Sequence, residues 1–561
     1  MRGERARLYF GWDDKHLALG ADGLCLWQNR RMKKIVVAFL LLVILAACTP
    51  ATQLPANTPT TSTIPPPSAT ATSTPKPEAL WVDPAVPAEL MNLSQTWGIP
   101  LTDDPSLATQ KLELSDSGSL WIYALVAPFP TLTDEVDSQA LIATWQGNST
   151  DPIAGHTLLM TESTLAVFTT LWGEPASSVV KVVLLEQMLD IAWSESAWAI
   201  IPFEEIQPKW KVLGVDGQSP IHKNFDVNAY PLKAYFALSS DGFTLPESNR
   251  DSSKMTTVVL TGVTALTRLT AQRMEKKGIT YPGEVLRDMF READILHINH
   301  ESPFYSGCPY PDAKQTTEVF CSSPKYIGLF TDLSVDVMEL SGDHFADYDS
   351  SAMLESIEIY RNAGIRYYGG GVNEEDGKKP LLMDVNGNKI MFIGCDFKTV
   401  YATARADRPG SVRCDFDYIT QQIQTYKAQG YLPIFTYQYH EFPSPETRPQ
   451  QQADYRLIAD AGAVVVSGSQ AHVAQGMEFY KDSFIHYGLG NLFFDQMSSK
   501  GTRITQYEFI DRHVFYNGKY LGVELITAFL EDYSRPRYMT KDEREKFLSM
   551  MFGYSEWDVQ E

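Results

Sequence analysis

The chain has 561 residues, of which 44% are hydrophobic and 12% aromatic, and it carries a formal net charge of −22. This length predicts more than one domain, because single hydrophobic cores seldom grow beyond about 250–300 residues. The acidic balance argues against nucleic acid and anionic membrane surfaces as partners, and it means that an anionic substrate would need a local cation, most simply a metal ion.

Residues 32–47 have the composition of a bacterial export signal. Met32 and two lysines precede a run of thirteen apolar residues, 35–47, which is too short to span a bilayer. The run ends in Leu-Ala-Ala followed by Cys48, a pattern that resembles a bacterial lipobox. We therefore expect Cys48 to be the lipidated first residue of an exported, extracytoplasmic protein, anchored to the bacterial membrane by its lipid. Residues 1–31 would then be an upstream over-extension of the reading frame. The alternative for the apolar run is a buried helix.

Residues 48–78 are expected to form an extended stalk. Of the 30 residues from 49 to 78, 20 are Pro, Thr or Ser, a composition that cannot bury a hydrophobic core. A first globular unit, residues 79–248, follows it. Its segments LVAPFPTLTDEVDSQALIATWQG and WAIIPFEEI resemble periplasmic substrate-binding proteins of the phosphate- or molybdate-binding kind. The resemblance implies a smaller, binding-protein-like α/β domain.

Strand-like and helix-like segments then alternate from residue 255 to 535, which is typical of a layered α/β fold, and residues 536–561 form a helical tail. Five β-rich runs each lead into a polar cluster; they are residues 256–260, 294–298, 335–340, 432–437 and 463–466. Ligands of open α/β sheets bind at the carboxyl ends of the strands. We therefore expect these clusters to form one site.

The loop LSGDHFADYD, residues 340–349, contains the densest of these clusters. Asp349 or Ser350 stands where the N-cap of a following amphipathic helix belongs, and Asp349 is the expected cap. Asp343, His344 and Asp347 lie too early to cap that helix. Carboxylate oxygens beside an imidazole suit a divalent cation or general acid–base chemistry.

Several motifs from residue 255 to 495 carry a family resemblance. In chain order they are ADILHINHESP, LSGDHFAD, the stretch ETRPQQQADYRLIADAGAVVVSGSQAHVAQGMEFY, and HYGLGNLFFD. This series resembles the CapA family of bacterial capsule and poly-γ-glutamate synthesis proteins. The resemblance implies a layered α/β sandwich of the metallophosphatase-like type. It also implies a part in making, exporting or anchoring an extracellular anionic polymer, with that polymer or its synthesis machinery as the partner.

The resemblance implies a metal site as well, although this chain departs from the family pattern. Val263 stands in place of a carboxylate, and Tyr437 and Ser469 stand in place of histidines. A two-metal centre needs a bridging carboxylate and several imidazoles. We therefore expect at most one divalent ion, zinc or manganese, with the ligands Glu301, Asp343, His344 and His472. A metal-free acid–base or binding cleft is the alternative.

If the domain is catalytic, His344 is the acid–base group, oriented by Asp347, and Glu441 shares the site. The substrate would contact Asn299, His440 and Gln470, with His440 standing in for the lost histidine near Glu441. The competing interpretation is a non-catalytic surface receptor or scaffold whose altered site only binds polymer.

Four cysteines of the exported part form two close pairs in the sequence. Outside the cytoplasm we expect two disulfides, Cys308 with Cys321 and Cys395 with Cys414, each stabilising the fold by up to about 3 kcal/mol. Metal ligation by the four thiols is the alternative, and neither pair has CxxC spacing.

Overall fold

The computed structural model describes residues 78–148, 151–240, 242–496, 503–555 and 557. The predicted export signal, Cys48 and nearly all of the Pro/Thr/Ser-rich segment lie outside the described residues. Within the part of the chain that is described, no helix is both long and apolar enough to cross a membrane.

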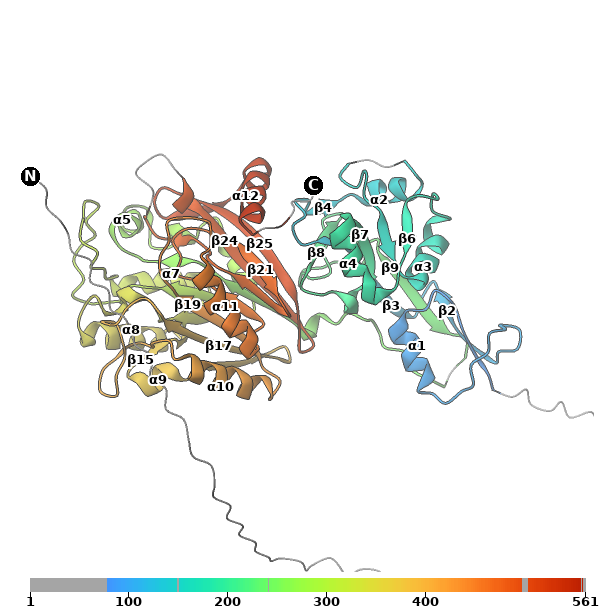
Figure 1. Ribbon diagram of the computed structural model, residues 1–561, viewed down its shortest axis with the longest axis horizontal. Coiled ribbons are helices and arrows are strands. Elements are labelled where there is room, and N and C mark those ends of the chain that lie inside the picture. The colour runs from blue at the N-terminus through green and yellow to red at the C-terminus, as the bar shows by residue number, and fades with distance from the viewer. Residues whose placement is uncertain (1–77, 149–150, 241, 497–502, 556, 558–561) are drawn as a thin grey trace, which may run out of the picture. The chain divides into compact units, whose positions relative to one another are not determined.

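Residues 80–238 build a mixed sheet of nine strands (Figure 1). Its central strand β3 (Ser119–Pro128) is buried from Trp121 onward and pairs with β9 (Lys233–Leu238), β7 (Trp198–Pro202) and β8 (Trp210–Val215). The other strands are β1 (Leu80–Val82), β2 (Gln110–Ser115), β4 (Glu135–Val136), β5 (Leu158–Met160) and β6 (Val180–Val182). The helices are α1 (Ala88–Gln95), α2 (Ser138–Trp145), α3 (Glu162–Trp172) and α4 (Leu185–Glu195). This part is therefore an α/β unit, as predicted.

Residues from 255 onward build two further sheets (Figure 1). The first has nine strands, seven of which follow the order β14-β13-β12-β10-β24-β25-β26. Their bounds are β10 (Met255–Leu260), β12 (Ile295–His300), β13 (Val337–Glu339), β14 (Arg366–Tyr368), β24 (Tyr507–Tyr516), β25 (Lys519–Glu531) and β26 (Arg535–Tyr538). The short strands β11 (Val263–Thr264) and β23 (Asn491–Phe493) complete it.

The second sheet of this part has six strands in the order β16-β17-β19-β20-β22-β21. They are β16 (Leu381–Val385), β17 (Asn388–Asp396), β19 (Leu432–Gln438), β20 (Val465–Ser467), β21 (Met477–Tyr480) and β22 (Ser483–His486). A separate two-stranded ribbon pairs β15 (Gly370–Gly371) with β18 (Gly410–Ser411). The short helix α9 (Glu374–Lys378) lies between these two strands in the chain.

Alternating side chains pack the two sheets against each other. Val258, Phe392 and Ile434 contribute to one core between the sheets. Their neighbours point the opposite way, as side chains of successive strand residues do. Val259 packs under helices α5 (Arg268–Lys277), α6 (Arg287–Glu292), α7 (Ile327–Asp332) and α8 (Ser350–Asn362). Ile393 and Phe435 pack under α10 (Phe416–Lys427) and α11 (Pro449–Ala461). The result is a four-layer α/β/β/α sandwich, which confirms the predicted layered α/β class.

Parallel pairing places the carboxyl ends of the inner strands at the same edge. In the first sheet, β10, β12, β13 and β14 run parallel to one another. In the second, β17, β19, β20 and β22 do the same. The C-terminal helix α12 (Lys541–Tyr554), which begins at a capping box of Thr540 and Glu543, packs on the core between the sheets through Phe547 and Met551.

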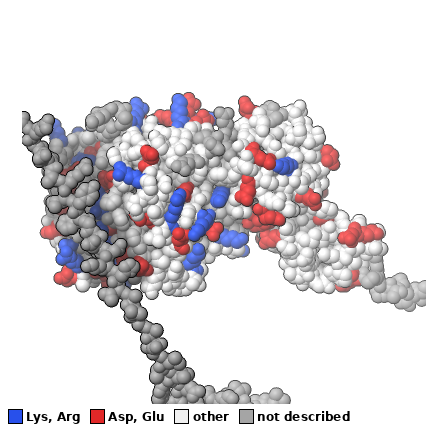
Figure 2. Space-filling model, viewed as in Figure 1, with Lys and Arg blue, Asp and Glu red and all other residues white. Residues whose placement is uncertain are grey.

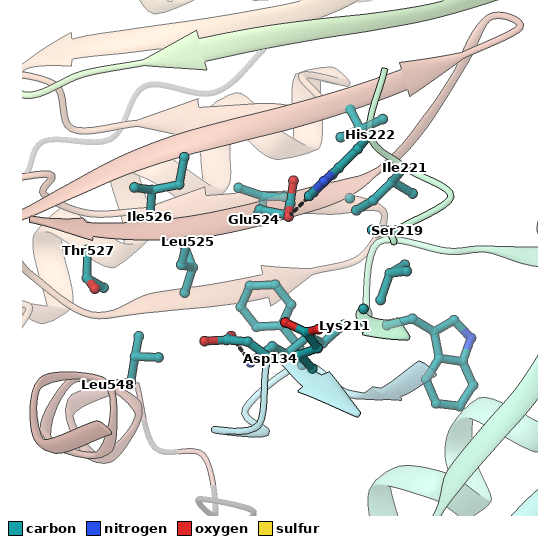
Figure 3. Close-up of a pocket in the computed structure, with 18 of the residues that line it drawn as sticks. Asp134, Lys211, Ser219, Ile221, His222, Glu524, Leu525, Ile526, Thr527 and Leu548 are labelled. Carbon is teal, nitrogen blue, oxygen red and sulfur yellow. Dashed lines mark hydrogen bonds and ion pairs between the residues drawn. The ribbon is translucent and has the colours of Figure 1, made fainter. Parts of the chain in front are cut away.

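A cavity of about 380 Å³ lies where β25 faces the residues around β4 and β8 (Figure 3). Apolar side chains such as Leu525 and Leu548 form much of its wall. Several charged groups of its wall are ion-paired: Asp134 with Lys211 and Arg544, and Glu524 with His222 and with Arg512.

Both predicted disulfides are confirmed. Cys308 is bonded to Cys321 and Cys395 to Cys414, with Cα–Cα distances of 5.8 and 5.0 Å. The four sulfurs are therefore bonded to one another, and the alternative of a thiolate metal site does not hold. Cys395 lies at the end of β17, immediately before the loop that enters the candidate site.

Candidate functional site

The candidate site lies where the carboxyl ends of β12, β13, β17, β19 and β20 meet, between the two sheets of the sandwich. Hydrogen bonds join these strand ends directly. Gln470 Nε2 donates to Asn299 Oδ1 at 2.7 Å, and Gln438 Nε2 donates to Asp343 Oδ1 at 2.7 Å. Close packing is needed here: a Cβ on Gly342 would lie 2.7 Å from the Cα of Glu301. The polar clusters that follow four of the five predicted runs thus come together.

The fifth predicted run, β10, is followed by β11, which pairs with β12 beside Asn299 but supplies no charged side chain to the cluster. Val263 of β11 packs with Ala265, Phe320 and Phe494. The position where the family pattern has a carboxylate therefore supplies an apolar contact.

Lys398, from the loop after β17, provides the positive charge at the centre of the site. Its Nζ lies 2.6 Å from Asp343 Oδ2 and also forms an ion pair with Glu441 Oε1. Asp343 is nearly buried, with 3% of its side chain exposed, whereas Lys398 is 26% exposed. Burial raises the pKa of Asp343, but His344 and Lys398 outweigh burial and hold it below its ordinary value. One ammonium group thus bridges carboxylates from two different loops.

His344 is oriented by Asp347, as predicted from the sequence. The 3₁₀ turn Asp343–Ala346 brings both residues close together, and His344 Nδ1 lies 2.7 Å from Asp347 Oδ2. Asp347 Oδ2 also accepts a hydrogen bond from the backbone N–H of Phe320, which fixes the carboxylate. Burial lowers the pKa of His344, but Asp347, Glu301 and Asp343 outweigh burial and raise it to about 9. This histidine therefore presents its Nε2 to the site from a fixed position.

His472 is held in a similar way from another loop. Its Nδ1 lies 2.8 Å from Asn491 Oδ1, and its Nε2 lies 3.7 Å from Glu441 Oε1. The hydrogen bond to Asn491 fixes the orientation of the ring.

Glu301 is fully buried, and neither of its carboxylate oxygens has a hydrogen-bond partner among the described residues. Burial raises the pKa of this carboxyl to about 7, although His472 and His344 act to lower it. A buried carboxylate without partners is costly. Such a group in a polar cluster marks the place where a ligand would supply the missing hydrogen bonds.

Two side chains near the carboxyl end of β19 pack against residues outside the polar cluster. His440 is exposed and packs its ring near Phe397, Tyr439 and Phe442, and its contact with a substrate stays a prediction. Tyr437 stacks on Tyr455 of α11, on the outer face of β19. The neighbouring Gln438 faces the site instead, because successive strand residues alternate between faces.

The site contains residues that sequence reasoning missed. They are Lys398, Gln438 and Glu339, the last of which accepts hydrogen bonds from Ser341 and, at 2.5 Å, from Ser469. A signal for Lys398 was present in the sequence: β17 is a further β-rich run, and the polar sequence Cys-Asp-Phe-Lys begins at its end. That run leads into no histidine, so the strand-end pattern did not single it out.

The predicted metal ligands do not fit a divalent ion as their side chains lie. Within the described residues, no three His, Cys, Asp or Glu side chains are grouped to hold a metal ion. Asp343 uses one oxygen for Gln438 and the other for Lys398. The ammonium of Lys398 stands between carboxylates that a metal ion would have to share. The arrangement suits the binding of an anion beside Lys398, or proton transfer by His344 and Glu301.

Comparisons with known proteins agree with the sequence motifs. Residues 257–496 match the family model described as bacterial capsule synthesis protein PGA_cap. The capsule biosynthesis protein CapA of Bacillus anthracis is 25% identical over 274 residues, covering 47% of this chain and 66% of the relative. The PGA biosynthesis protein CapA of Bacillus subtilis (strain 168) is 26% identical over 250 residues, covering 44% and 64%. The chain thus spans slightly less than two thirds of either relative.

Among solved structures, a 5'-nucleotidase precursor from Thermus thermophilus aligns with a TM-score of 0.30 at 13% identity. The alignment covers 54% of this chain and 58% of that one. The family match and the order of the motifs show that residues 257–496 of this chain resemble the bacterial capsule synthesis proteins of the PGA_cap family.

Proposed function

We propose that this protein is an exported bacterial surface protein that takes part in making, exporting or anchoring an extracellular anionic polymer of the poly-γ-glutamate type. The observation that carries the proposal is the match of residues 257–496 to the capsule synthesis family, over the same segment that builds the polar site. The relatives that match are named for capsule and PGA biosynthesis. Attachment through a lipid on Cys48 is part of the proposal, since the motif before it resembles a lipobox.

The polar site is proposed to bind carboxylates of the polymer. The overall charge of −22 repels a polyanion, so binding needs a local positive charge. Lys398 and His344 are the cations of the site, partly exposed at 26% and 14% of their side chains. A polymer carboxylate would exchange with Asp343, Glu441 or Asp347 to reach them. On the face shown in Figure 2, acidic side chains are spread over the whole molecule, while lysine and arginine gather mainly on the part built after residue 255. A polymer would therefore meet its cations on the domain that carries the site.

Acid–base hydrolysis or transfer is a second candidate function, favoured by the pair of His344 and Asp347. The pair has the geometry of a general acid–base group held by a carboxylate. Glu301 lies in the same cluster without partners and could exchange a proton with a substrate.

Deleting the gene in its own host tests the proposal. We expect the cell-associated anionic polymer to be lost or strongly reduced, and to return when the full chain is supplied in trans. Polymer content is measured after hydrolysis as glutamate bound to washed cells. An unchanged polymer content in the deletion strain would contradict the proposed function.

The deletion strain also distinguishes a site that binds polymer from a site that catalyses a reaction. A copy with His344→Gln keeps a hydrogen-bonding side chain but lacks an imidazole. If the site only binds, this copy should restore polymer content in part, because Lys398 keeps its positive charge. If the site catalyses, it should restore little, and the purified wild-type protein should change the length distribution of poly-γ-glutamate on a gel.

A further inference from the structure

We propose that Lys398 is the resident cation of the candidate site and takes the place that a divalent metal ion would occupy. The site then assembles without a metal, and the lysine excludes one. The inference concerns the ion content of the site and does not depend on which polymer the protein serves.

The first argument is the position of the ammonium group. Lys398 Nζ lies 2.6 Å from Asp343 Oδ2 and is ion-paired with Glu441 Oε1, so it joins loops that follow β13 and β19. The other oxygen of Asp343 already accepts a hydrogen bond from Gln438 at 2.7 Å. A metal ion that used Asp343 and Glu441 would have to displace Lys398 from both carboxylates. Two cations within a few ångströms of each other repel strongly in a buried site.

The second argument is that the loop is built to hold the lysine in place. Asp396 accepts a hydrogen bond from the backbone N–H of Thr399 at 2.9 Å, and it also bonds the Thr399 hydroxyl. Arg413 donates to the carbonyl oxygens of Phe397 at 3.1 Å and Thr399 at 2.6 Å. The disulfide of Cys395 with Cys414 ties the start of the loop to the segment that carries Arg413. The backbone on both sides of Lys398 is thus fixed before any ligand arrives.

The third argument concerns the side chains that a metal ion would need. Val263 is packed among apolar residues, Tyr437 faces α11, and Ser469 donates to Glu339. These contacts replace donors that would point into the site. What remains around the lysine is Glu301, buried and without partners among the described residues, and the imidazoles of His344 and His472. With Lys398 present, these three groups do not converge on a common point that could hold an ion.

Metal titration of the full chain tests the inference. The protein is stripped with a chelator, and zinc or manganese is titrated at neutral pH by calorimetry. The acidic surface also binds ions weakly elsewhere. Metal binding at this site is therefore defined as the portion of the measured binding that is lost when His472 is replaced by alanine. We expect wild-type protein and His472→Ala to give the same titration.

Lys398→Met keeps most of the length of the unbranched side chain and removes its charge. Asp343 and Glu441 then have no cation, so the variant should bind one ion at least about tenfold more tightly than wild type. This gain in metal affinity should vanish in the double variant that combines Lys398→Met with His472→Ala. Lys398→Arg keeps a cation and should behave as wild type. Lys481→Met is the matched control, because Lys481 is also ion-paired, with Asp460, but lies in the turn before β22, away from the site.

Two results would overturn the inference. One is a wild-type protein that binds a full equivalent of metal which His472→Ala abolishes. The other is a folded Lys398→Met variant that gains no site-specific ion. If Lys398→Met does not fold, the comparison of wild type with His472→Ala decides alone: equal titrations support the inference, and unequal ones contradict it.

Discussion

At the scale of single residues, the loop Leu340–Asp349 divides into two functions. Asp349 accepts hydrogen bonds from the backbone N–H groups of Ser351 and Ala352 and so caps α8. Asp343 and His344 instead face the site, with Asp347 holding the imidazole. The ion-pair partner of Asp343 is Lys398, which is 55 positions further along the chain.

Replacing Lys398 with alanine should destabilise the protein by about 3 kcal/mol, because removing one partner of a buried ion pair leaves the other charge uncompensated. The stranded charge is Asp343, which is 3% exposed. Urea unfolding measures the loss. Adding Asp343→Asn to the variant should recover part of it, since no buried charge is then left. If the two substitutions are simply additive, the ion pair does not have the role given to it here.

At the scale of the elements, α8 offers a test that separates folding from function. Asp349→Ala removes the N-cap and should lower the free energy of unfolding by about 1 kcal/mol without changing the site. Asp347→Asn leaves the cap intact but loosens His344, so it should reduce polymer binding or turnover. Thermal unfolding and polymer binding are measured on both variants. Loss of binding in Asp349→Ala at a temperature where it is folded would contradict this division.

The loop after β17 depends on its disulfide. Replacing Cys395 and Cys414 by serine opens a link between residues 19 positions apart and should cost about 3 kcal/mol. The ends of the Lys398 loop should then become mobile, so amide hydrogen exchange at Phe397 and Thr399 should quicken more than in the core strands. Unchanged exchange at these positions would show that Asp396 and Arg413 hold the loop by themselves.

The sequence was sufficient for the elements and for part of the site. The helical spacing of Met353, Leu354, Ile357 and Tyr360 predicted the apolar face of α8; Met353, Ile357 and Tyr360 are buried, whereas Leu354 is exposed. The strand-end rule placed Asn299, Glu301, Asp343 and His472 at one edge. It could not pair Lys398 with Asp343, because such a long-range contact is set by how two sheets pack and not by local pattern.

The same limit explains His440 and Tyr437. Both lie near the end of a predicted strand, but the face of the sheet to which a side chain points changes from each residue to the next. The strand continues to Gln438, whose side chain takes the inward position, and Tyr437 therefore packs on Tyr455. The backbone then leaves the sheet, and His440 becomes exposed. A shift of one residue in the expected end of a strand reverses which side chain faces the site.

At the scale of the whole molecule, ion pairs join the nine-stranded sheet of residues 80–238 to the sandwich. His222 pairs with Glu524 at 2.8 Å, and Asp134 pairs with Arg544 at 2.7 Å. Tyr516 donates to the carbonyl oxygen of Asn249 at 3.3 Å. Asn249, between β9 and β10, also hydrogen-bonds the backbone of Ile122 in β3, so this connector contacts both parts of the chain.

The pair of Glu524 with Arg512 and His222 predicts a loss of stability in acid. Burial raises the pKa of Glu524, but Arg512 and His222 outweigh burial and lower it to about 2 from the ordinary 4.5. Because the folded-state value is the lower one, this carboxylate stabilises the fold above pH 4.5 and loses that effect as the pH falls toward 2. The loss should amount to about 3 kcal/mol. Urea unfolding between pH 5 and 2 measures it against Glu524→Gln, whose stability should fall less steeply; parallel curves would contradict the assignment.

The measurement that tests the central claim most directly is the binding of poly-γ-glutamate to the full-length protein, followed by calorimetry or sedimentation. Wild type should bind the polymer, and added salt should weaken binding because it screens the charges. Lys398→Met should bind about tenfold more weakly, since a charge-assisted hydrogen bond is lost, while Lys481→Met should bind as wild type does. A wild-type protein that does not bind the polymer, or equal affinities of wild type and Lys398→Met, would contradict the account.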